Sequence, residues 1–482
     1  MQIVILIAFV LVMSLRQVPG LAWPVAMLGP AVALYVALAA ALAALSTSVS
    51  TKAFFEPGPA SLSSRRRRGL LNVVVPLYLL AGLAALIYLG LWDLVSGNRI
   101  IRAVPLLAEV ILITPFVLAM LVTWWMDYPF HRMMRMQMAR QMAIEGWLAP
   151  MWTLRQYISF NLRHTFLFIA VPVGLIILLN DLMLRAWPQI LAAFDTVAAR
   201  VHLPALTENG VGILQVAMSL ALSGLVFLIS PALIVRIWQT SPMPAGELRD
   251  ALLATLRSLG LRCRQLLVWH SGGVIANAGV MGLIAPLRYV LMTDSLMERM
   301  DRRQVQAVFA HELGHIQQHH IFYSALFTLA AVGWVSLAAE ALERAWPMNE
   351  YVMMAVQLVG LAAVWWLGFG YISRRFERQA DVIAAWSAGQ PYNTSGDADT
   401  IAGEGAAIFA SALRRVAQLN NVGTNAPNWR HGTIDWRVQH ILYLGATGGT
   451  RRDADRLARR IKRVLWLGMV ACVALVIYLA VS

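Results

Sequence analysis

Apolar residues run through this chain in long blocks and do not alternate with polar ones. Eight of these blocks are long enough to cross a bilayer as helices; they lie at residues 23–46, 70–92, 105–125, 165–184, 211–237, 322–345, 351–371 and 463–481. A shorter apolar run at residues 3–15 has the length of a signal-peptide core, but no basic residue precedes it and no clear cleavage site follows. We therefore predict an uncleaved first helix and a mainly helical, polytopic membrane protein.

The composition supports this class of protein. Hydrophobic residues make up 59% of the 482 positions and charged residues only 13%, which is too apolar for a soluble protein of this length. The net charge of +14 could indicate a nucleic-acid-binding protein, but the arginines cluster between the apolar blocks, as in Arg65–Arg68 and the 132–163 loop. Basic loops mark the cytoplasmic side of membrane proteins. We therefore expect the lipid bilayer, and no nucleic acid, to be the partner behind this charge.

The apolar blocks and basic loops divide the chain into five parts. We expect N-terminal transmembrane helices, a first cytoplasmic polar segment, a transmembrane hairpin, a second cytoplasmic polar segment and a C-terminal transmembrane helix. In this order, the parts span residues 1–237, 238–321, 322–371, 372–462 and 463–482. Arginine greatly outnumbers lysine and alanine is abundant, which is typical of a GC-rich genome and favours a bacterial inner membrane.

The first polar segment contains the motif His-Glu-Leu-Gly-His at residues 311–315. Asp301, with a glutamine three residues later, has the form of a helix cap and predicts that a helix runs through this motif. One helical turn apart, His311 and His315 can both bind one zinc ion, and Glu312 beside them can act as the general base of a peptidase. Because HExxH also occurs by chance in helices, a pair of buried structural histidines is the alternative.

The zinc ion needs a third protein ligand, and the membrane topology selects it. Three glutamates beyond the first span of the hairpin would be carried about 30 Å away across the bilayer: Glu340, Glu343 and Glu350. The second span returns the chain to the starting side, where Glu377 is the first glutamate. Asp381 follows one turn later and is placed to accept a hydrogen bond from a ligand histidine. The alternative for Glu377 is an ion pair with a neighbouring arginine on the helix surface.

Several motifs in a fixed order make the segment 240–445 resemble the membrane zinc endopeptidases of the HtpX and CAAX prenyl protease family, which are gluzincins. Residues 277–282 are similar to the family's NAxxxG sequence, residues 311–320 to its HExGHxxxxH sequence and residues 373–381 to its SRxxExxAD sequence. The hairpin of two spans between the last two motifs is like that of the CAAX prenyl protease branch.

His431 and Arg437 have the six-residue separation of the family's HPxxxxR element, with Gly432 in place of the usual proline. The resemblance implies a cytoplasmic zincin-like domain of helices with a small β-sheet. It further implies one zinc ion per chain, held by the HExxH histidines and the glutamate of the SRxxExxAD motif. It also implies that His431 donates to the oxyanion of the reaction and that Arg437 holds this element in place. A surface histidine and a loop arginine are the alternatives that the residues alone leave open.

The glycine-rich stretch before the HExxH helix suits the exposed edge of a β-sheet, whose backbone could pair with an extended peptide. Such glycines could equally mark a turn or a bulge. The stretch includes the NAxxxG segment, and we expect the substrate to contact Asn277, Ala278, Gly279 and Gly282.

These features predict an integral membrane zinc metalloendopeptidase that cuts membrane proteins or peptides at the cytoplasmic face. Because bacteria generally lack prenylated proteins, we favour a role in membrane protein quality control over CAAX-type processing of lipidated peptides. The alternative from another class is a non-proteolytic scaffold or transporter with a degenerate peptidase domain. The motif residues are intact and the sequence has no internal repeat typical of transporters, which favours the enzyme. The sequence does not predict the oligomeric state.

Overall fold

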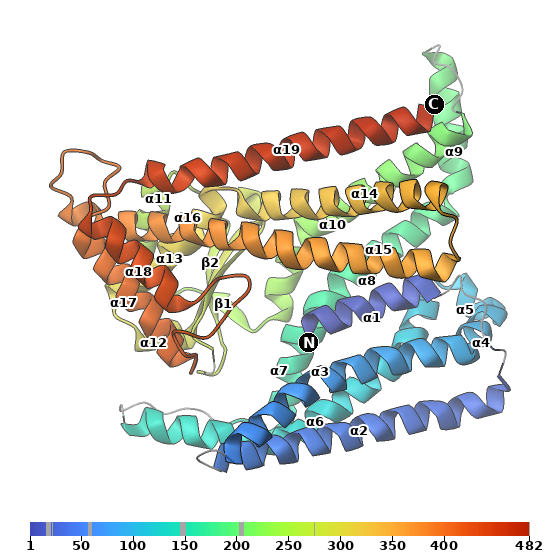
Figure 1. Ribbon diagram of the computed structural model, residues 1–482, viewed down its shortest axis with the longest axis horizontal. Coiled ribbons are helices and arrows are strands. Elements are labelled where there is room, and N and C mark those ends of the chain that lie inside the picture. The colour runs from blue at the N-terminus through green and yellow to red at the C-terminus, as the bar shows by residue number, and fades with distance from the viewer. Residues whose placement is uncertain are drawn as a thin grey trace. The chain divides into compact units, whose positions relative to one another are not determined.

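The chain divides into two compact units, which meet in sequence at Trp238 and Gln239 (Figure 1). The computed structural model describes residues 1–15, 21, 23–55, 60–144, 151–201, 207–273 and 275–481. Both units consist mostly of helices. In the described part of the chain, 8 helical segments are long and apolar enough to cross a membrane. The prediction of a polytopic helical membrane protein is thereby confirmed.

The first unit is built from helices joined by short connections. The α-helices are α1 (Gln2–Leu15), α2 (Val25–Phe55), α3 (Ala60–Leu86), α4 (Trp92–Gly97), α5 (Arg99–Ala103), α6 (Leu107–Ile144), α7 (Leu154–Asn161), α8 (Phe168–Arg185), α9 (Trp187–Arg200) and α10 (Glu208–Ile237), and π-helical turns are η1 (Ile87–Leu91) and η2 (Leu162–Leu167). The predicted spans of this unit lie largely within the candidate membrane spans Val25–Phe55, Arg66–Gly97, Leu107–Gln137, Leu154–Arg185 and Gly210–Ile237. The short apolar run forms α1, which has 14 residues.

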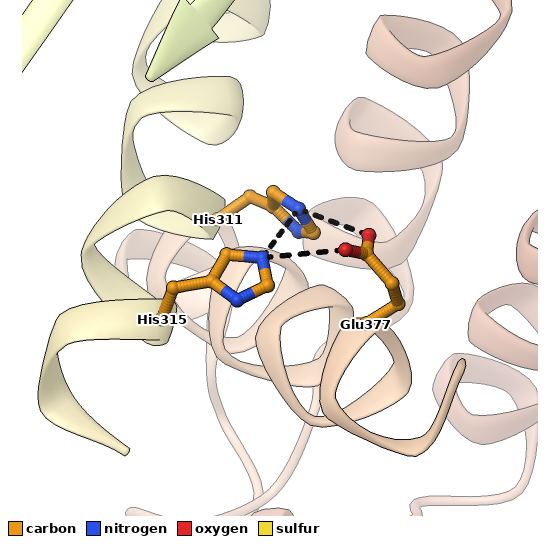
Figure 2. Close-up of side chains that lie close together, drawn as sticks. All are labelled: His311, His315 and Glu377. Carbon is orange, nitrogen blue, oxygen red and sulfur yellow. Dashed lines mark hydrogen bonds and ion pairs between the residues drawn. The ribbon is translucent and has the colours of Figure 1, made fainter. Parts of the chain in front are cut away.

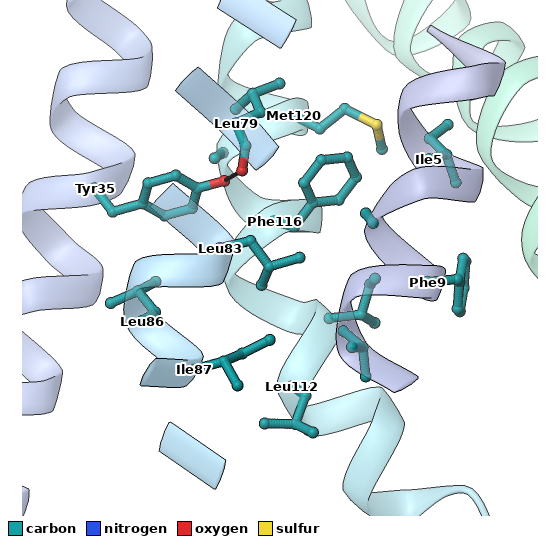
Figure 3. Close-up of a cluster of buried hydrophobic side chains, with 14 of the residues drawn as sticks. Ile5, Phe9, Tyr35, Leu79, Leu83, Leu86, Ile87, Leu112, Phe116 and Met120 are labelled. Atoms are coloured by element: carbon teal, nitrogen blue, oxygen red, sulfur yellow. Dashed lines mark hydrogen bonds between the residues drawn. The ribbon is translucent and has the colours of Figure 1, made fainter. Parts of the chain in front are cut away.

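The core of the first unit forms where α1, α3 and α6 pack together (Figure 3). Ile5, Leu83 and Phe116, one from each helix, are fully buried there. Helix α2 joins this core through Tyr35, whose hydroxyl donates a hydrogen bond to the Leu79 carbonyl oxygen at 2.7 Å. This bond satisfies a phenol that would otherwise be buried among apolar side chains without an acceptor.

The second unit combines a small sheet with helices. Its elements are β1 (Thr240–Pro242), α11 (Glu247–Ser258), β2 (Gln265–Trp269), β3 (Ala278–Met281), η3 (Ala285–Leu287), β4 (Tyr289–Thr293), α12 (Asp294–Arg299), α13 (Arg302–Gln317), α14 (His320–Ala345), α15 (Glu350–Val364), η4 (Trp365–Phe369), α16 (Gly370–Gly389), η5 (Gln390–Tyr392), α17 (Gly403–Leu419), α18 (Ile434–Ala446) and α19 (Arg451–Val481). Its candidate membrane spans are His320–Ala345, Val352–Tyr392 and Asp455–Leu479, which contain the last three predicted spans almost entirely.

The strands of the described residues form one sheet in the order β1-β2-β4-β3. Strands β2 and β4 are parallel, whereas β1 and β3 pair antiparallel with their neighbours, so β3 is an edge strand. The Thr293 N–H donates to the Asn277 carbonyl oxygen at 3.0 Å. Because hydrogen-bonded positions alternate along an antiparallel pair, the N–H groups of Ala278 and Val280 point to the free edge. The predicted small sheet is therefore present, and β3 lies at one of its edges.

Helix α13 carries the HExxH motif through the interior of the second unit. The Asp301 side chain accepts a hydrogen bond from the Gln304 N–H at 3.0 Å, which caps the helix as predicted. On one face, Phe309 and Leu313 are buried with residues of the sheet, and on another face Ala310 is buried with residues of α17 and α18. Since side chains pack against α13 on more than one side, the hydrophobic core fixes its position.

Helices α16 and α17 are so close that Gly405 leaves no room for a side chain. A Cβ atom there would lie 2.3 Å from the Ala385 carbonyl oxygen and 2.4 Å from Gly389 Cα. Gly405→Ala should therefore force the helices apart and destabilise the protein by about 1–3 kcal/mol, measured by thermal unfolding in detergent. The control is Gly423→Ala, because no described atom would lie within 4 Å of its Cβ. Equal unfolding midpoints for the two variants would contradict this packing.

Candidate metal centre and active site

Helices α13 and α16 approach each other closely at Gly314, inside the HExxH motif. A Cβ atom at Gly314 would lie 3.1 Å from Ala380 Cα, so the glycine and the small alanine let the two backbones come together. As a result, His311 and His315 of α13 point toward Glu377 of α16 (Figure 2). The structure thus brings together three residues that the sequence separates by a membrane hairpin.

The donor atoms of these three side chains form a compact group. The distance is 3.3 Å between His311 Nε2 and His315 Nε2, 3.5 Å between His311 Nε2 and Glu377 Oε2, and 3.6 Å between His315 Nε2 and Glu377 Oε1. Ligand atoms about 2.0–2.2 Å from a tetrahedral zinc ion are separated by roughly 3.3–3.5 Å. Two imidazole nitrogens and one carboxylate oxygen also match the donor set of catalytic zinc sites. The residues present therefore fit a zinc ion.

Asp381 and Arg437 support this group from behind. The His311 Nδ1 atom lies 3.0 Å from Asp381 Oδ1, so the carboxylate stands beside the ring as the sequence predicts. Arg437 donates through Nε to Asp381 Oδ2 at 2.9 Å, and its Nη1 lies 3.3 Å from Glu377 Oε2. The Asp381 and Arg437 side chains are only 1% and 6% exposed. A single buried guanidinium therefore forms ion pairs with two buried carboxylates and offsets part of their negative charge.

The interior environment changes the acidity of the motif residues. Burial raises the pKa of the Glu312 carboxyl to about 7, and the Val280 N–H forms a hydrogen bond with this group. A carboxyl with a pKa near neutrality is suited to accept a proton and return it. Burial lowers the pKa of His315 to about 4, so this imidazole is neutral and can act as a ligand. Burial also disfavours the charged form of His311, but the carboxylates of Asp381 and Glu377 together outweigh this effect, and the pKa rises to about 9.

The loop before α18 brings His431 to the same group. Its Nδ1 lies 2.8 Å from Glu377 Oε1, and its side chain is 40% exposed, so it stands at the open side of the group. The Asn428 side chain accepts a hydrogen bond from the His431 N–H at 3.0 Å and shapes this turn. Gly432 has φ +74°, and a Cβ atom there would lie 2.9 Å from the Trp436 ring. Proline cannot adopt this φ value, which explains why glycine replaces it here.

The four residues of the predicted peptide-binding edge have different structural roles. The Asn277 side chain accepts a hydrogen bond from the Ala278 N–H at 3.0 Å. Gly279 lies where no described atom would come within 4 Å of a Cβ. Gly282 has φ +100°, and a Cβ atom there would lie 2.2 Å from the Leu287 carbonyl oxygen. Backbone geometry thus requires the glycine at 282, while open space surrounds the one at 279.

His320 is a site residue that the sequence did not predict. On a continuous helix it would lie about half a turn from His311, on the other side of the helix. Instead, α13 ends at Gln317, and His319 adopts a left-handed conformation with φ 57° that starts a new helix. This break turns His320 back, so its Nδ1 lies 2.8 Å from the Nδ1 atom of His315. The only signal in the sequence was the final histidine of the HExGHxxxxH pattern.

Comparison with known proteins relates this geometry to a class. Residues 242–442 match the model of the family described as Peptidase family M48. The crystal structure of S. mikatae Ste24p matches with a TM-score of 0.50 and 15% sequence identity, over 86% of this chain and 99% of that chain. At this identity, the match shows a shared fold. None of the curated proteins matches the sequence significantly.

The fold and the site define a membrane zinc metalloprotease, a hydrolase whose substrate is a peptide and whose surroundings are a lipid bilayer. Residues 242–442 are its M48 peptidase domain. The predicted enzyme class is thereby confirmed, and the family match agrees with the resemblance of the sequence motifs. The roles of individual site residues, and zinc binding by this chain, remain predictions.

Replacing Arg437 with methionine should leave two buried carboxylates without their shared cation. Removing one partner of a buried ion pair costs about 3–5 kcal/mol, so Arg437→Met should strongly lower the unfolding midpoint of the metal-free protein. Arg452→Met is the matched control, because Arg452 pairs with Asp399 at 2.7 Å while 75% exposed, and its loss should cost about 1 kcal/mol or less. Similar shifts in the two variants would show that Arg437 does not stabilise these carboxylates.

Proposed function

We propose that this chain binds one zinc ion through His311, His315 and Glu377 and hydrolyses peptide bonds of membrane proteins or peptides at the cytoplasmic face. The observation that carries the proposal is the convergence of three donor atoms within 4.8 Å of one another, beside Glu312 and the free edge of β3. A structural histidine pair would not need a buried carboxylate as its third member. It would also not need a second, proton-accepting carboxyl next to it.

The side chains divide the chemistry between them. A zinc ion held by His311, His315 and Glu377 would supply a Lewis acid that lowers the pKa of a water molecule and polarises the peptide carbonyl. Glu312 takes the proton from this water and returns it to the leaving amine, a role that fits its pKa of about 7. His431, at the open side of the group, donates a hydrogen bond to the oxyanion. Asp381 orients His311, and Arg437 holds Asp381 and Glu377 in place through ion pairs.

The substrate binds in extended form along β3. Edge strands bind peptides through backbone hydrogen bonds. The outward N–H groups of Ala278 and Val280 donate to the Asn277 side chain and to Glu312, so a peptide bound at this edge replaces these partners. A peptide paired with this edge therefore passes directly over the general base. Because backbone pairing does not depend on side chains, cleavage has a loose sequence preference. This property suits quality control of misfolded membrane proteins in a bacterial inner membrane.

Zinc binding and cleavage should separate in single variants. Wild type should contain about one zinc ion per chain and cleave an unfolded casein-like protein. His311→Ala and Glu377→Ala should lose both properties, because each removes a ligand. Glu312→Gln should keep the zinc and lose cleavage by about 10²–10⁴-fold, because it removes only the proton acceptor. Metal analysis and a peptide-release assay on the purified proteins measure these outcomes.

The matched control is Glu298→Gln, which makes the same change at an exposed position of α12. It should leave zinc content and cleavage at the wild-type level. Zinc that survives Glu377→Ala would assign the third ligand elsewhere. Wild type without zinc, or full cleavage by Glu312→Gln, would refute the peptidase mechanism.

The cytoplasmic orientation of the peptidase domain can be tested by cysteine labelling. In a Cys263→Ser background, Thr394→Cys lies in the exposed loop after η5 and should react with a membrane-impermeant maleimide only in everted vesicles. Pro347→Cys, in the exposed turn between α14 and α15, should react only in right-side-out vesicles. One membrane span lies between this turn and the Thr394 loop, so the two positions are on opposite sides of the membrane. The reverse pattern would place the domain outside the cytoplasm.

A further inference from the structure

The C-terminal helix α19 reaches the end of the HExxH helix through a buried lysine. Helix α19 packs against α14 and α16 within the second unit (Figure 1). Lys462 is 9% exposed, and its Nζ donates to the Gln318 carbonyl oxygen at 2.8 Å and to the Gln318 side chain at 3.2 Å. Gln318 is the C-cap of α13, where unpaired carbonyls attract a positive charge. Lys462 thus fixes the end of the helix that carries the motif.

A buried glutamine connects α19 to the interior of the site. Gln379 of α16 is 1% exposed. Its amide nitrogen donates to the Gln318 side chain at 2.9 Å and to the Asp455 carboxylate of α19. Its amide oxygen lies 3.0 Å from His320 Nε2. Each polar atom of this buried side chain therefore has a partner, and one of these partners is a carboxylate from the C-terminal helix.

The connection continues to a predicted zinc ligand. The Nδ1 atoms of His320 and His315 lie 2.8 Å apart, while His315 Nε2 faces Glu377. If Nε2 of His315 binds the metal, its Nδ1 carries the proton and donates to His320 Nδ1. His320 must then carry its own proton on Nε2, which donates to the Gln379 oxygen. The amide of Gln379 in turn donates to Asp455. All hydrogen bonds run in one direction, from the ligand to the carboxylate.

The plane of the connecting imidazole is also fixed. The His320 ring stacks on Phe376 with a centroid distance of 4.2 Å and an interplanar angle of 5°, and the residue is 3% exposed. A ring held in this way can transmit orientation to His315. The two ligand histidines are thus supported differently, since His311 has a carboxylate in direct contact and His315 has one at the end of a chain.

We propose that α19 is part of the active site. Asp455 orients His315 and fixes its tautomer through Gln379 and His320, and these three are positioning residues for the metal centre. The inference rests on the proposed zinc site. Ligand histidines generally donate their second N–H to a carboxylate or carbonyl, which raises their basicity. The relay gives His315 this support from a helix that follows all the motif residues in the sequence.

The test measures the zinc dissociation constant by chelator competition on the full-length protein in detergent. His320→Phe keeps the ring stack but removes both nitrogens, and it should weaken zinc binding by about 10–100-fold. Asp455→Asn removes the terminal charge and should weaken binding by on the order of 3–10-fold, less than loss of a direct partner. Both variants should alter the visible absorption bands of the cobalt-substituted protein, because these report the geometry of the ligands. Asp455→Glu keeps the carboxylate and should recover most of the affinity.

The double variant distinguishes a relay from separate structural effects. His320→Phe combined with Asp455→Asn should bind zinc as His320→Phe alone does, because both changes interrupt one chain. Asp250→Asn, the same change at an exposed position of α11, should bind zinc like wild type.

Three results would overturn the relay while leaving the peptidase proposal intact. They are zinc affinity and cobalt spectra within twofold of wild type in both single variants, fully additive losses in the double variant, or equal losses in Asp455→Asn and Asp455→Glu. The last result would indicate disturbed packing and no role for the charge. Wild-type protein that binds no zinc would instead refute the proposed function itself.

Discussion

The contact between α13 and α16 at Gly314 and Ala380 is the constraint on which the rest of the site depends. A Cβ atom at Gly314 would lie 3.1 Å from Ala380 Cα, so the two helices are as close as these small residues allow. The donor atoms of His311, His315 and Glu377 reach metal-ligand spacing because of this approach. Packed interiors do not deform gradually, so a larger residue at either position would shift a whole helix. The glycine inside the HExxH motif therefore has a packing role as well as a place in the pattern.

The close approach of α13 and α16 also buries charged side chains, and a few side chains of opposite charge or with hydrogen-bonding groups compensate for this burial. Arg437 contacts two carboxylates at once, and Lys462 covers the carbonyl end of α13. Ionised groups in such surroundings are costly unless each has a partner. The partners come from α18 and α19, which lie far from the HExxH motif in the sequence. Helices α18 and α19 supply no predicted zinc ligand, but their charged side chains stabilise the buried groups around the site.

The sequence predicted what depends on local pattern and on topology. The eight spans and the capped helix through the motif follow from hydrophobic blocks and a cap signal, and the small sheet follows from the family resemblance. The count of membrane crossings predicted Glu377 on the side of the histidines, and the structure brings it next to them. The sequence did not predict the role of His320, because a single left-handed residue at His319 breaks the helix and changes its direction. It also did not predict the contacts of α19, which depend on long-range packing. The backbone conformation of one residue and the packing of a helix that is distant in sequence produce no periodic pattern of hydrophobic residues.

The order of the site residues along the chain has a consequence for biogenesis. The two motif histidines are synthesised first, Glu377 emerges only after a hairpin of two spans, and Asp455 and Lys462 come later still. A nascent chain in which the hairpin is not inserted cannot bring Glu377 back to the histidines. The three donor groups can therefore meet only after both spans of the hairpin have been inserted. Insertion of the hairpin is thus a condition for a complete set of donor groups.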